Sequence, residues 1–348
     1  MSTTLSSLSA GSSEIAGFVK LSAQLGAAPL LIQASGGNTS IKEDNILWVK
    51  ASGKVLADAE VEDIFVAVEL EGVREAVAHN ETDPVSAYVA TETALRPSIE
   101  TTLHALLPHR VVLHVHSVNA LRWTVRVDGK DRVAEKMQGL NWVWVPYCRP
   151  GVPLTRGVEK AAGSNPDILV LGNHGLVVGG DSVVEAEARL RETEARLTGP
   201  RRGQPSAAFG KLAAAIGDAP YVAAEGDTAH ALAIDAFALE NARGGPLYPD
   251  HVVFLGPEAP VAENGRTVAA VADDYKARYG ENPAYVIVEG AGVAVRSERP
   301  FGVEAMLTCQ ADVLLRIDTD ASLNFLNATE IAELMNWDAE KYRRTLNP

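Results

Sequence analysis

Short apolar runs, rich in β-branched residues and bounded by turn-forming residues, most constrain how this chain of 348 residues can fold. The clearest run is Val111–Val115, and the same character is found in Ile46–Val49, Ile64–Leu70, Asn141–Tyr147 and Asp167–Val178. Runs of this kind are typical of β-strands. None approaches the roughly 18 apolar residues of a membrane-spanning helix, so we expect an α/β protein without a membrane segment.

Segments with a helical spacing of apolar residues alternate with these runs. The clearest is Asp181–Leu197, where an Asp-Ser start precedes Glu and Arg residues that can pair along one helix. Asn327–Glu330 has the pattern of a capping box and predicts the start of a last helix. Further helices are expected at Glu14–Leu25, Ser86–Thr93, Pro97–Leu107, Thr267–Tyr279 and Val303–Arg316.

A polar segment divides the chain into two expected domains. Thr198–Ser206 contains two prolines and no apolar residue, which is typical of a linker. We therefore predict one domain over residues 14–200 and a second, smaller α/β domain over residues 207–348. In the second domain, His251–Leu255 and Tyr285–Val288 are predicted as strands.

The charge and cysteine content limit what the chain can bind. Lys and Arg total 31 and Asp and Glu total 45, and the resulting net charge of −14 opposes binding to nucleic acid. Cys148 and Cys309 are the only cysteines, which excludes a disulfide scaffold and a four-cysteine zinc site. Residues 1–13 lack the basic start and apolar core of a secretory signal. We therefore expect a cytoplasmic protein that binds a small molecule.

Two histidines separated by one residue lie at the end of a predicted strand. Because side chains alternate along a strand, His114 and His116 point to the same face, where two imidazoles can bind one Zn²⁺. A motif this short also arises by chance. His174, in Asn173-His-Gly175 after another apolar run, could complete a three-histidine site with an open coordination position.

Glu100 lies in Pro97-Ser-Ile-Glu100, at the predicted start of a helix. A carboxylate there interacts favourably with the helix dipole, so a structural and a catalytic role both stay open. His104 follows four residues later on the same helix face, which fits a metal ligand or, more commonly, a helix-packing side chain. The other histidines stand alone in polar or loop contexts: His79, His109, His230 and His251.

Two segments rich in Gly and Ser are candidates for anion binding. Ser35–Ser40 and Ser52–Lys54 offer backbone N–H groups, hydroxyls and one cation, a combination that suits a phosphate or a carboxylate. Neither segment has the spacing of a Walker A loop or of a dinucleotide-binding fingerprint.

Six short motifs, in this order, resemble those of the class II aldolase/adducin family. They are Gly37-Asn-Thr-Ser40, Ser52-Gly53, Pro97-Ser-Ile-Glu100, His114-Val-His116, Val145-Pro-Tyr147 with Gly151, and Asn173-His-Gly175. The resemblance covers about residues 14–200 and implies a central, mostly antiparallel sheet flanked by helices. It further implies a homo-oligomer, usually a homotetramer, and a zinc-dependent aldolase, a lyase of carbohydrate metabolism. Such an enzyme makes or breaks a C–C bond in a sugar-derived ketose or hydroxy-oxo acid through a metal-stabilised enediolate.

The resemblance also assigns roles to individual residues. The metal ligands, for zinc or another divalent metal, correspond to His114, His116 and His174, and the acid–base carboxylate corresponds to Glu100. Tyr147 corresponds to a proton donor that family enzymes receive from the neighbouring subunit. The substrate-binding residues correspond to Asn38, Ser40, Ser52, Gly53 and Ser98.

Phosphosugar aldolases of the family have a second Ser where this chain has Ile99, so the sequence does not decide whether the substrate is phosphorylated.

Three other functions stay open beside the aldolase. A decarboxylase of a 3-oxo sugar acid or its phosphate would form the same enediolate. Family 4-epimerases tend to have Asp in the place of Glu100, which favours the aldolase. A non-enzymatic module like the adducin head lacks the histidine set, so we place it last.

The second domain has a fainter resemblance of its own. It is similar to the aldolase segment of bifunctional rhamnulose-phosphate aldolase/dehydrogenase proteins in Tyr285–Val295, Cys309–Ile317 and Leu323–Tyr342. This similarity indicates sugar metabolism and adds no catalytic residue.

Overall fold

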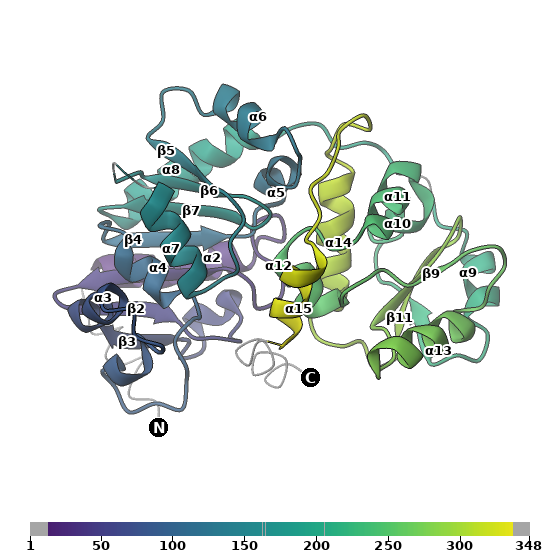
Figure 1. Ribbon diagram of the computed structural model, residues 1–348, viewed down its shortest axis with the longest axis horizontal. Helices are drawn as coiled ribbons and strands as arrows, with labels where there is room; N and C mark the ends of the chain where they lie inside the picture. The colour runs from purple at the N-terminus through teal and green to yellow at the C-terminus, as the bar shows by residue number, and fades with distance from the viewer. Residues whose placement is uncertain (1–12, 162, 164, 205, 337–348) are drawn as a thin grey trace. The chain divides into compact units, whose positions relative to one another are not determined.

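The computed structural model describes residues 13–161, 163, 165–204 and 206–336, which form two compact units (Figure 1). Among the described residues, unit 1 contains those up to Ala120 together with Lys130–Thr198, and unit 2 contains Leu121–Gly129 and those from Gly199 onward. Residues 121–129 therefore group with unit 2, although they lie inside the range predicted for the first domain. Two sequence predictions fall partly on residues that are not described. They are the absence of a secretory signal in residues 1–13 and the fainter resemblance over Leu323–Tyr342. No described helix is long and apolar enough to cross a membrane.

A seven-stranded sheet organises unit 1, in the order β3-β2-β1-β4-β7-β6-β5. All neighbouring strands are antiparallel except β5 and β6, which confirms the mostly antiparallel sheet implied by the resemblance. The predicted apolar runs supply six of these strands, while β1 overlaps the Gly/Ser-rich segment Ser35–Ser40. The central β4 is buried along its whole length. The strands are β1 (Asn38–Glu43), β2 (Ile46–Lys50), β3 (Phe65–Glu69), β4 (Val111–Val115), β5 (Trp142–Val145), β6 (Ile168–Leu171) and β7 (Gly175–Gly180).

Helices cover both faces of this sheet. One face carries α2 (Ser13–Gly26) and α8 (Val183–Leu197), and the other carries α3 (Leu70–Ala78), α4 (Thr101–Leu106) and α7 (Val152–Ala161). Neighbouring residues of β1 show the division, because Thr39 contacts Ser22 of α2 while Ser40 contacts His104 of α4. The 3-10 turn η1 (Leu56–Glu60) lies between β2 and β3. The 3-10 turn η2 (Ser86–Tyr88) and the helices α5 (Val118–Thr124) and α6 (Gly129–Lys136) lie between β3 and β7.

Two helix predictions in unit 1 are wrong. The stretch Ser86–Thr93 forms only the turn η2, because Asp83 Oδ1 accepts from the backbone N–H of Ser86 at 3.1 Å and offers the chain an alternative to a helix. The helix expected from Pro97 begins at Thr101 instead. Pro97 bridges Ala51 in an extended conformation, since the chain on both sides of it bonds to the end of β2 and the residues after it.

Unit 2 is a smaller α/β unit built on a four-stranded sheet, in the order β8-β11-β10-β9. Its strands are β8 (Tyr221–Ala223), β9 (Val261–Ala262), β10 (Tyr285–Val288) and β11 (Gly292–Arg296), and only β9 and β10 are parallel. Its helices are α9 (Phe209–Ile216), α10 (Ala231–Ile234), α11 (Ala236–Gly244), α12 (Pro249–Leu255), α13 (Val268–Tyr279), α14 (Val303–Leu314) and α15 (Ala328–Asn336).

In unit 2, the structure confirms one local sequence prediction and contradicts another. The capping box is confirmed, because Asn327 Oδ1 accepts from Glu330 N at 3.1 Å and Glu330 Oε2 accepts from Asn327 N at 2.8 Å. The strand predicted over His251–Leu255 is wrong, because these residues belong to α12. Pro249 in the first turn fixes a helical φ, and a short apolar run fits a buried helix as well as a strand.

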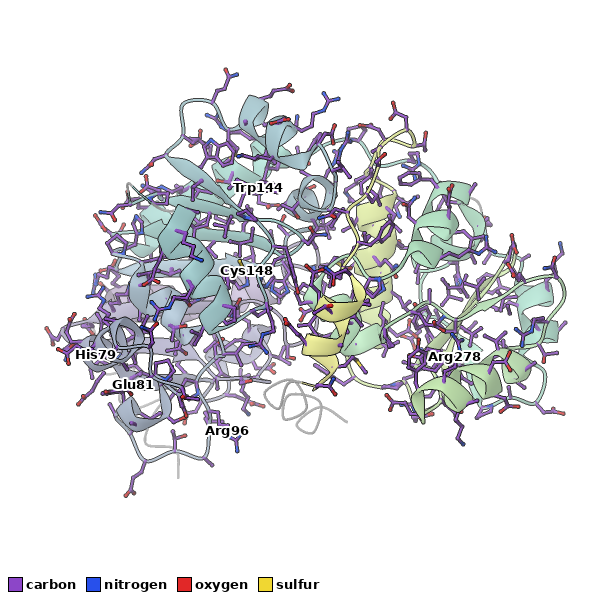
Figure 2. All side chains as sticks on the ribbon, viewed as in Figure 1. His79, Glu81, Arg96, Trp144, Cys148 and Arg278 are labelled. Atoms are coloured by element: carbon purple, nitrogen blue, oxygen red, sulfur yellow. The ribbon has the colours of Figure 1, made fainter. Side chains whose placement is uncertain are left out.

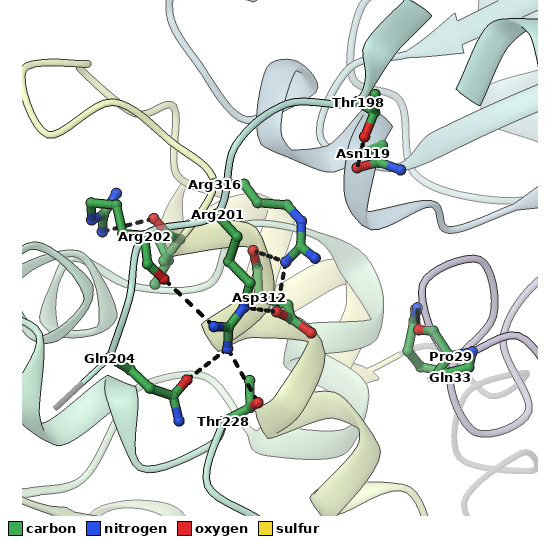
Figure 3. Close-up of polar contacts among 11 residues, drawn as sticks. Pro29, Gln33, Asn119, Thr198, Arg201, Arg202, Gln204, Thr228, Asp312 and Arg316 are labelled. Carbon is green, nitrogen blue, oxygen red and sulfur yellow. Dashed lines mark hydrogen bonds and ion pairs between the residues drawn. The ribbon is translucent and has the colours of Figure 1, made fainter. Parts of the chain in front are cut away.

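The described part of the predicted linker is anchored within unit 2 by two arginines. Arg201 Nε bonds Asp312 at 2.7 Å, and its Nη2 bonds Gln204 at 2.6 Å, as Figure 3 shows. The Arg202 backbone N–H donates to the carbonyl of Leu315 at 2.8 Å. The segment is therefore hydrogen-bonded to the end of α14 and to the residue just after it. The domain boundaries at residues 200 and 207 stay a prediction.

Candidate functional site

The predicted histidine motif lies at the end of β4, in the centre of the sheet of unit 1. His114 is completely buried and stands opposite Asn38 of β1, and His116 follows two residues later with the same side-chain direction. His174 reaches the same place from the turn between β6 and β7, because β7 pairs with β4. The sheet therefore assembles the three histidines from two segments, the end of β4 and the turn before β7.

Two glycines allow the backbone to approach this cluster. Gly175, with φ +153°, lies so close to β4 that a Cβ atom would stand 2.4 Å from the carbonyl oxygen of Val115. Gly37, with φ +56°, would place a Cβ atom 2.8 Å from the carbonyl oxygen of His114. Any side chain at either position would push the strands apart, so both glycines set the spacing of the site.

The three imidazoles converge closely enough to bind one metal ion. Their candidate ligand atoms all lie within 4.8 Å of one another, and His116 Nε2 is 3.1 Å from His114 Nε2. His114 Nδ1 lies 2.9 Å from the carbonyl oxygen of Leu176. Because a carbonyl only accepts, Nδ1 carries the hydrogen, and neutral His114 presents the lone pair of Nε2 to the cluster. This donor set fits a divalent metal.

Glu100 completes the cluster from the residue just before α4. Its Oε2 accepts from Asn38 Nδ2 at 2.8 Å and lies 3.3 Å from His114 Nε2, and its Oε1 lies 3.6 Å from His174 Nε2. Oε1 is buried and accepts no hydrogen bond from the described residues. Asn38 therefore holds one carboxylate oxygen and leaves the other directed at the histidines.

The surroundings of Glu100 favour its charged form. Burial raises the pKa of this carboxyl, but the positive charge of His114, His174 and His116 in their protonated forms and the hydrogen bond from Asn38 lower it by more, so that the pKa is about 2. Glu100 is therefore a carboxylate at neutral pH, the form that can accept a proton.

Tyr147 lies two residues beyond β5, between Trp144 and Cys148, which Figure 2 labels. Its backbone nitrogen would stand 3.1 Å from a Cβ atom on Gly172, so this segment runs beside the turn that carries His174. The main chain of Tyr147 is thus near the cluster within one chain, and the role given to its side chain stays a prediction.

The residues predicted to bind the remote end of a substrate have three different environments. Asn38 and Ser98 are buried beside Glu100, whose backbone N–H donates to Ser98 Oγ at 3.2 Å. Ser52 and Gly53 form the turn after β2, where Gly53 has φ +75°. Ser40 lies inside β1 rather than in a turn, and its hydroxyl contacts His104 Nδ1 at 2.7 Å.

The other histidines lie outside the cluster. His79 is exposed at the end of α3 (Figure 2), and His109 Nε2 contacts Asp167 at 2.9 Å. His230 Nδ1 accepts from Val293 N at 3.0 Å. The sequence does not predict the hydrogen bond between His114 Nδ1 and the carbonyl of Leu176. Every residue has a backbone carbonyl, so the residue type at position 176 carries no signal for it.

Together, the sheet and the site define an α/β protein with a buried three-histidine cluster and an adjacent carboxylate. The family model for the class II aldolase and adducin N-terminal domain matches residues 17–198. The chain belongs to this family, and membership together with its aldolase relatives supports an enzyme of this type.

Two curated relatives each match less than half of the chain. An L-fuculose phosphate aldolase of Methanococcus vannielii is 27% identical over 167 residues, which are 47% of this chain and 82% of that protein. YuxG of Bacillus subtilis, named an uncharacterized oxidoreductase, is 33% identical over 164 residues. That match covers 42% of this chain and only 24% of the Bacillus protein.

Solved structures match the same region. The class II aldolase domain of a Thermoplasma acidophilum protein is 27% identical, with a TM-score of 0.46, and covers 53% of this chain and 92% of that one. L-fuculose-1-phosphate aldolase of Thermus thermophilus is 16% identical, with a TM-score of 0.37, and covers 52% of this chain and 89% of that one.

Proposed function

We propose that residues 14–200 act as the catalytic domain of a zinc-dependent aldolase that cleaves or forms a C–C bond in a sugar-derived ketose or hydroxy-oxo acid. The observation that carries this proposal is the convergence of His114, His116 and His174 on one point beside a carboxylate oxygen that accepts no hydrogen bond from the described residues. The Methanococcus relative is named for an aldolase reaction, which supports the same class of chemistry.

The three histidines would hold the metal, zinc or another divalent ion. A divalent ion held by imidazoles supplies a Lewis acid that polarises a substrate carbonyl and lowers the free energy of the enediolate. The chain itself shields this place from bulk solvent, since His114, His174 and Glu100 are all buried. Exclusion of water strengthens each charge interaction in the site.

Glu100 is the acid–base group of the proposal. Asn38 fixes Oε2, so Oε1 is the atom that would accept the proton from the carbon next to the ketone and return it in the opposite direction. Tyr147 of a neighbouring subunit would exchange a proton with the hydroxyl of the aldehyde product. Asn38, Ser52, Gly53 and Ser98 are the proposed substrate-binding residues, although Ile99 weakens the expectation of a phosphate. Ser40 is predicted with them, but it has no exposed surface and its hydroxyl contacts His104, so the proposal does not use it for substrate binding.

The experiment that tests the reaction is a product screen with zinc-loaded protein. Ketose phosphates, unphosphorylated ketoses and 3-oxo sugar acids are incubated separately, and aldehyde and CO₂ are measured. Aldehyde release supports the aldolase, and CO₂ release without aldehyde replaces it with a decarboxylase. Interconversion of epimeric sugars without either product would indicate a 4-epimerase.

We also propose a homo-oligomer, because the role given to Tyr147 requires a neighbouring subunit, and we extend the homotetramer and the cytoplasmic location that the sequence predicts to this proposal. Sedimentation of the active protein tests this step. A fully active monomer at micromolar concentration would remove Tyr147 from the proposed mechanism.

A further inference from the structure

Strand β1 contacts α4 and the residues on either side of it through alternate side chains. Asn38 Nδ2 donates to Glu100 Oε2 at 2.8 Å, and Ser40 Oγ lies 2.7 Å from His104 Nδ1. Lys42 Nζ donates to the carbonyl of His109 at 2.7 Å and to that of Leu107. All three side chains of β1 are buried.

The spacing of these contacts fits both the two-residue repeat of strand β1 and the roughly four-residue repeat of helix α4. Two residues of a strand advance by about 6.7 Å, and four residues of an α-helix advance by about 6 Å. Asn38 and Ser40 are two residues apart and bond Glu100 and His104, which are four residues apart. The second contact therefore holds α4 in the register that the first contact needs.

His104 is linked to Glu100 through the helix itself. The backbone N–H of His104 donates to the carbonyl oxygen of Glu100 at 3.2 Å, so a movement of His104 along β1 carries Glu100 with it. Both Ser40 and His104 have no exposed surface. Loss of either partner would leave the other buried without its hydrogen bond, and α4 would shift to satisfy it.

We propose that Ser40 and His104 are positioning residues, whose hydrogen bond sets the place of the Glu100 carboxylate relative to His114 and His174. The inference rests on the proposed function, because the position of Glu100 matters only if Glu100 acts at the histidine cluster. A displacement of about 1 Å in a catalytic group can lower a rate by about 100-fold, so a contact one helical turn away has a measurable effect.

The chain supplies two matched controls for a merely structural role. Ser22 and Thr39 form a hydroxyl–hydroxyl contact of 2.7 Å on the opposite face of β1. Thr102 of α4 forms a contact of 2.7 Å with Thr155 of α7. These pairs are as buried as Ser40 and His104 and share β1 or α4 with them, but neither pair joins β1 to α4.

The first test compares Ser40→Ala with Ser22→Ala and Thr102→Val. Each protein is titrated with Co²⁺ alone, its visible absorption spectrum is recorded, and kcat, KM and Tm are measured on the substrate found in the product screen. We expect Ser40→Ala to alter the Co²⁺ spectrum and to lower kcat about 10- to 100-fold, with KM within about twofold. The two controls should keep the wild-type spectrum and kcat at a similar loss of Tm.

The second test asks where on residue 104 the hydrogen bond is needed. Asn places a polar atom close to the position of imidazole Nδ1, whereas Gln places it close to that of Nε2 and is the better helix former. A positioning role therefore predicts a higher kcat for His104→Asn than for His104→Gln, and a helix-packing role predicts the reverse order.

The outcomes separate the inference from the proposed function. Wild-type protein that binds no Co²⁺ and turns over no substrate overturns the proposed function and the inference with it. Wild-type protein that is active, with Ser40→Ala indistinguishable from the two controls in spectrum and kcat, overturns the positioning role alone.

Discussion

Asn38 and His114 are directly opposite each other on β1 and β4, and both contact the same oxygen of Glu100. The antiparallel register thus brings an amide donor, an imidazole and a carboxylate to one point, although the three residues lie far apart in the sequence. If either strand shifted by one residue, Asn38 or His114 would point to the other face of the sheet, and the three groups would no longer meet.

Glu100→Gln is expected to keep the fold and the metal and to lose most of the turnover. The amide has nearly the shape of the carboxylate, and its oxygen can still accept from Asn38. It has no basic oxygen for the proton, and acid–base groups typically supply 10²- to 10⁴-fold, about 3–5 kcal/mol of the barrier. Measurement of kcat, metal content and Tm on one preparation tests this. A variant with the wild-type kcat would leave Glu100 only its role at the start of the helix.

His174→Ala is expected to abolish stoichiometric zinc binding. Removing one of three ligands leaves two imidazoles, His114 and His116, which is below the three protein ligands of a catalytic zinc site. Metal analysis after purification without chelator provides the measurement. His79→Ala removes an exposed histidine and should retain the metal. Equal zinc content in the two variants would contradict the assignment of His174.

Gly175→Ala is expected to cost about 3 kcal/mol or more of stability and to weaken metal binding. The added Cβ would stand 2.4 Å from the carbonyl oxygen of Val115, so β7 and the turn carrying His174 must move. Gly139 also has a positive φ, +81°, but a Cβ atom there meets nothing within 4 Å. Gly139→Ala should therefore cost only about 1–2 kcal/mol and leave zinc affinity unchanged. Denaturant unfolding and zinc titration compare the two, and similar losses for both would show that the contact with β4 is unimportant.

His251 is expected to make unit 2 less stable in mild acid. Burial lowers the pKa of His251 to about 3, while an unfolded histidine has a pKa of about 6.5. Between these values the unfolded chain binds one proton more than the native chain, so the free energy of unfolding falls as the pH is lowered from 6.5 toward 3. This residue alone should account for about 2 kcal/mol of the loss between pH 7 and pH 5.

His251→Asn provides the measurement for this prediction. Asn keeps an acceptor near the place of Nδ1, which faces the backbone N–H of Leu247 at 3.4 Å, but it cannot be protonated. The variant should lose about 2 kcal/mol less stability than wild type between pH 7 and pH 5, and His79→Asn should behave as wild type. Parallel pH profiles of wild type and His251→Asn would refute a neutral, buried His251.

The sequence by itself determined six strands of unit 1 and β10, together with the helices α2, α4, α8, α13, α14 and α15. It also predicted which histidines form the cluster. The run Val111–Val115 is so apolar and β-branched that it is buried in any fold, and alternation along a strand then places His114 and His116 on one face. The capping box at Asn327 needs only residues that are adjacent in the chain. Signals of this kind survive without tertiary information because both partners lie within a few residues.

Only the tertiary structure decided which distant residues meet. His251–Leu255 has the composition of a strand, but its burial against α14 and α15 and the proline in its first turn select a helix. Ser40 belongs to a Gly/Ser-rich segment that suits anion binding, yet the register between β1 and α4 gives its hydroxyl to His104. The physical reason is that a hydrogen bond between residues 64 positions apart depends on how strands and helices pack, and neither residue type specifies its partner.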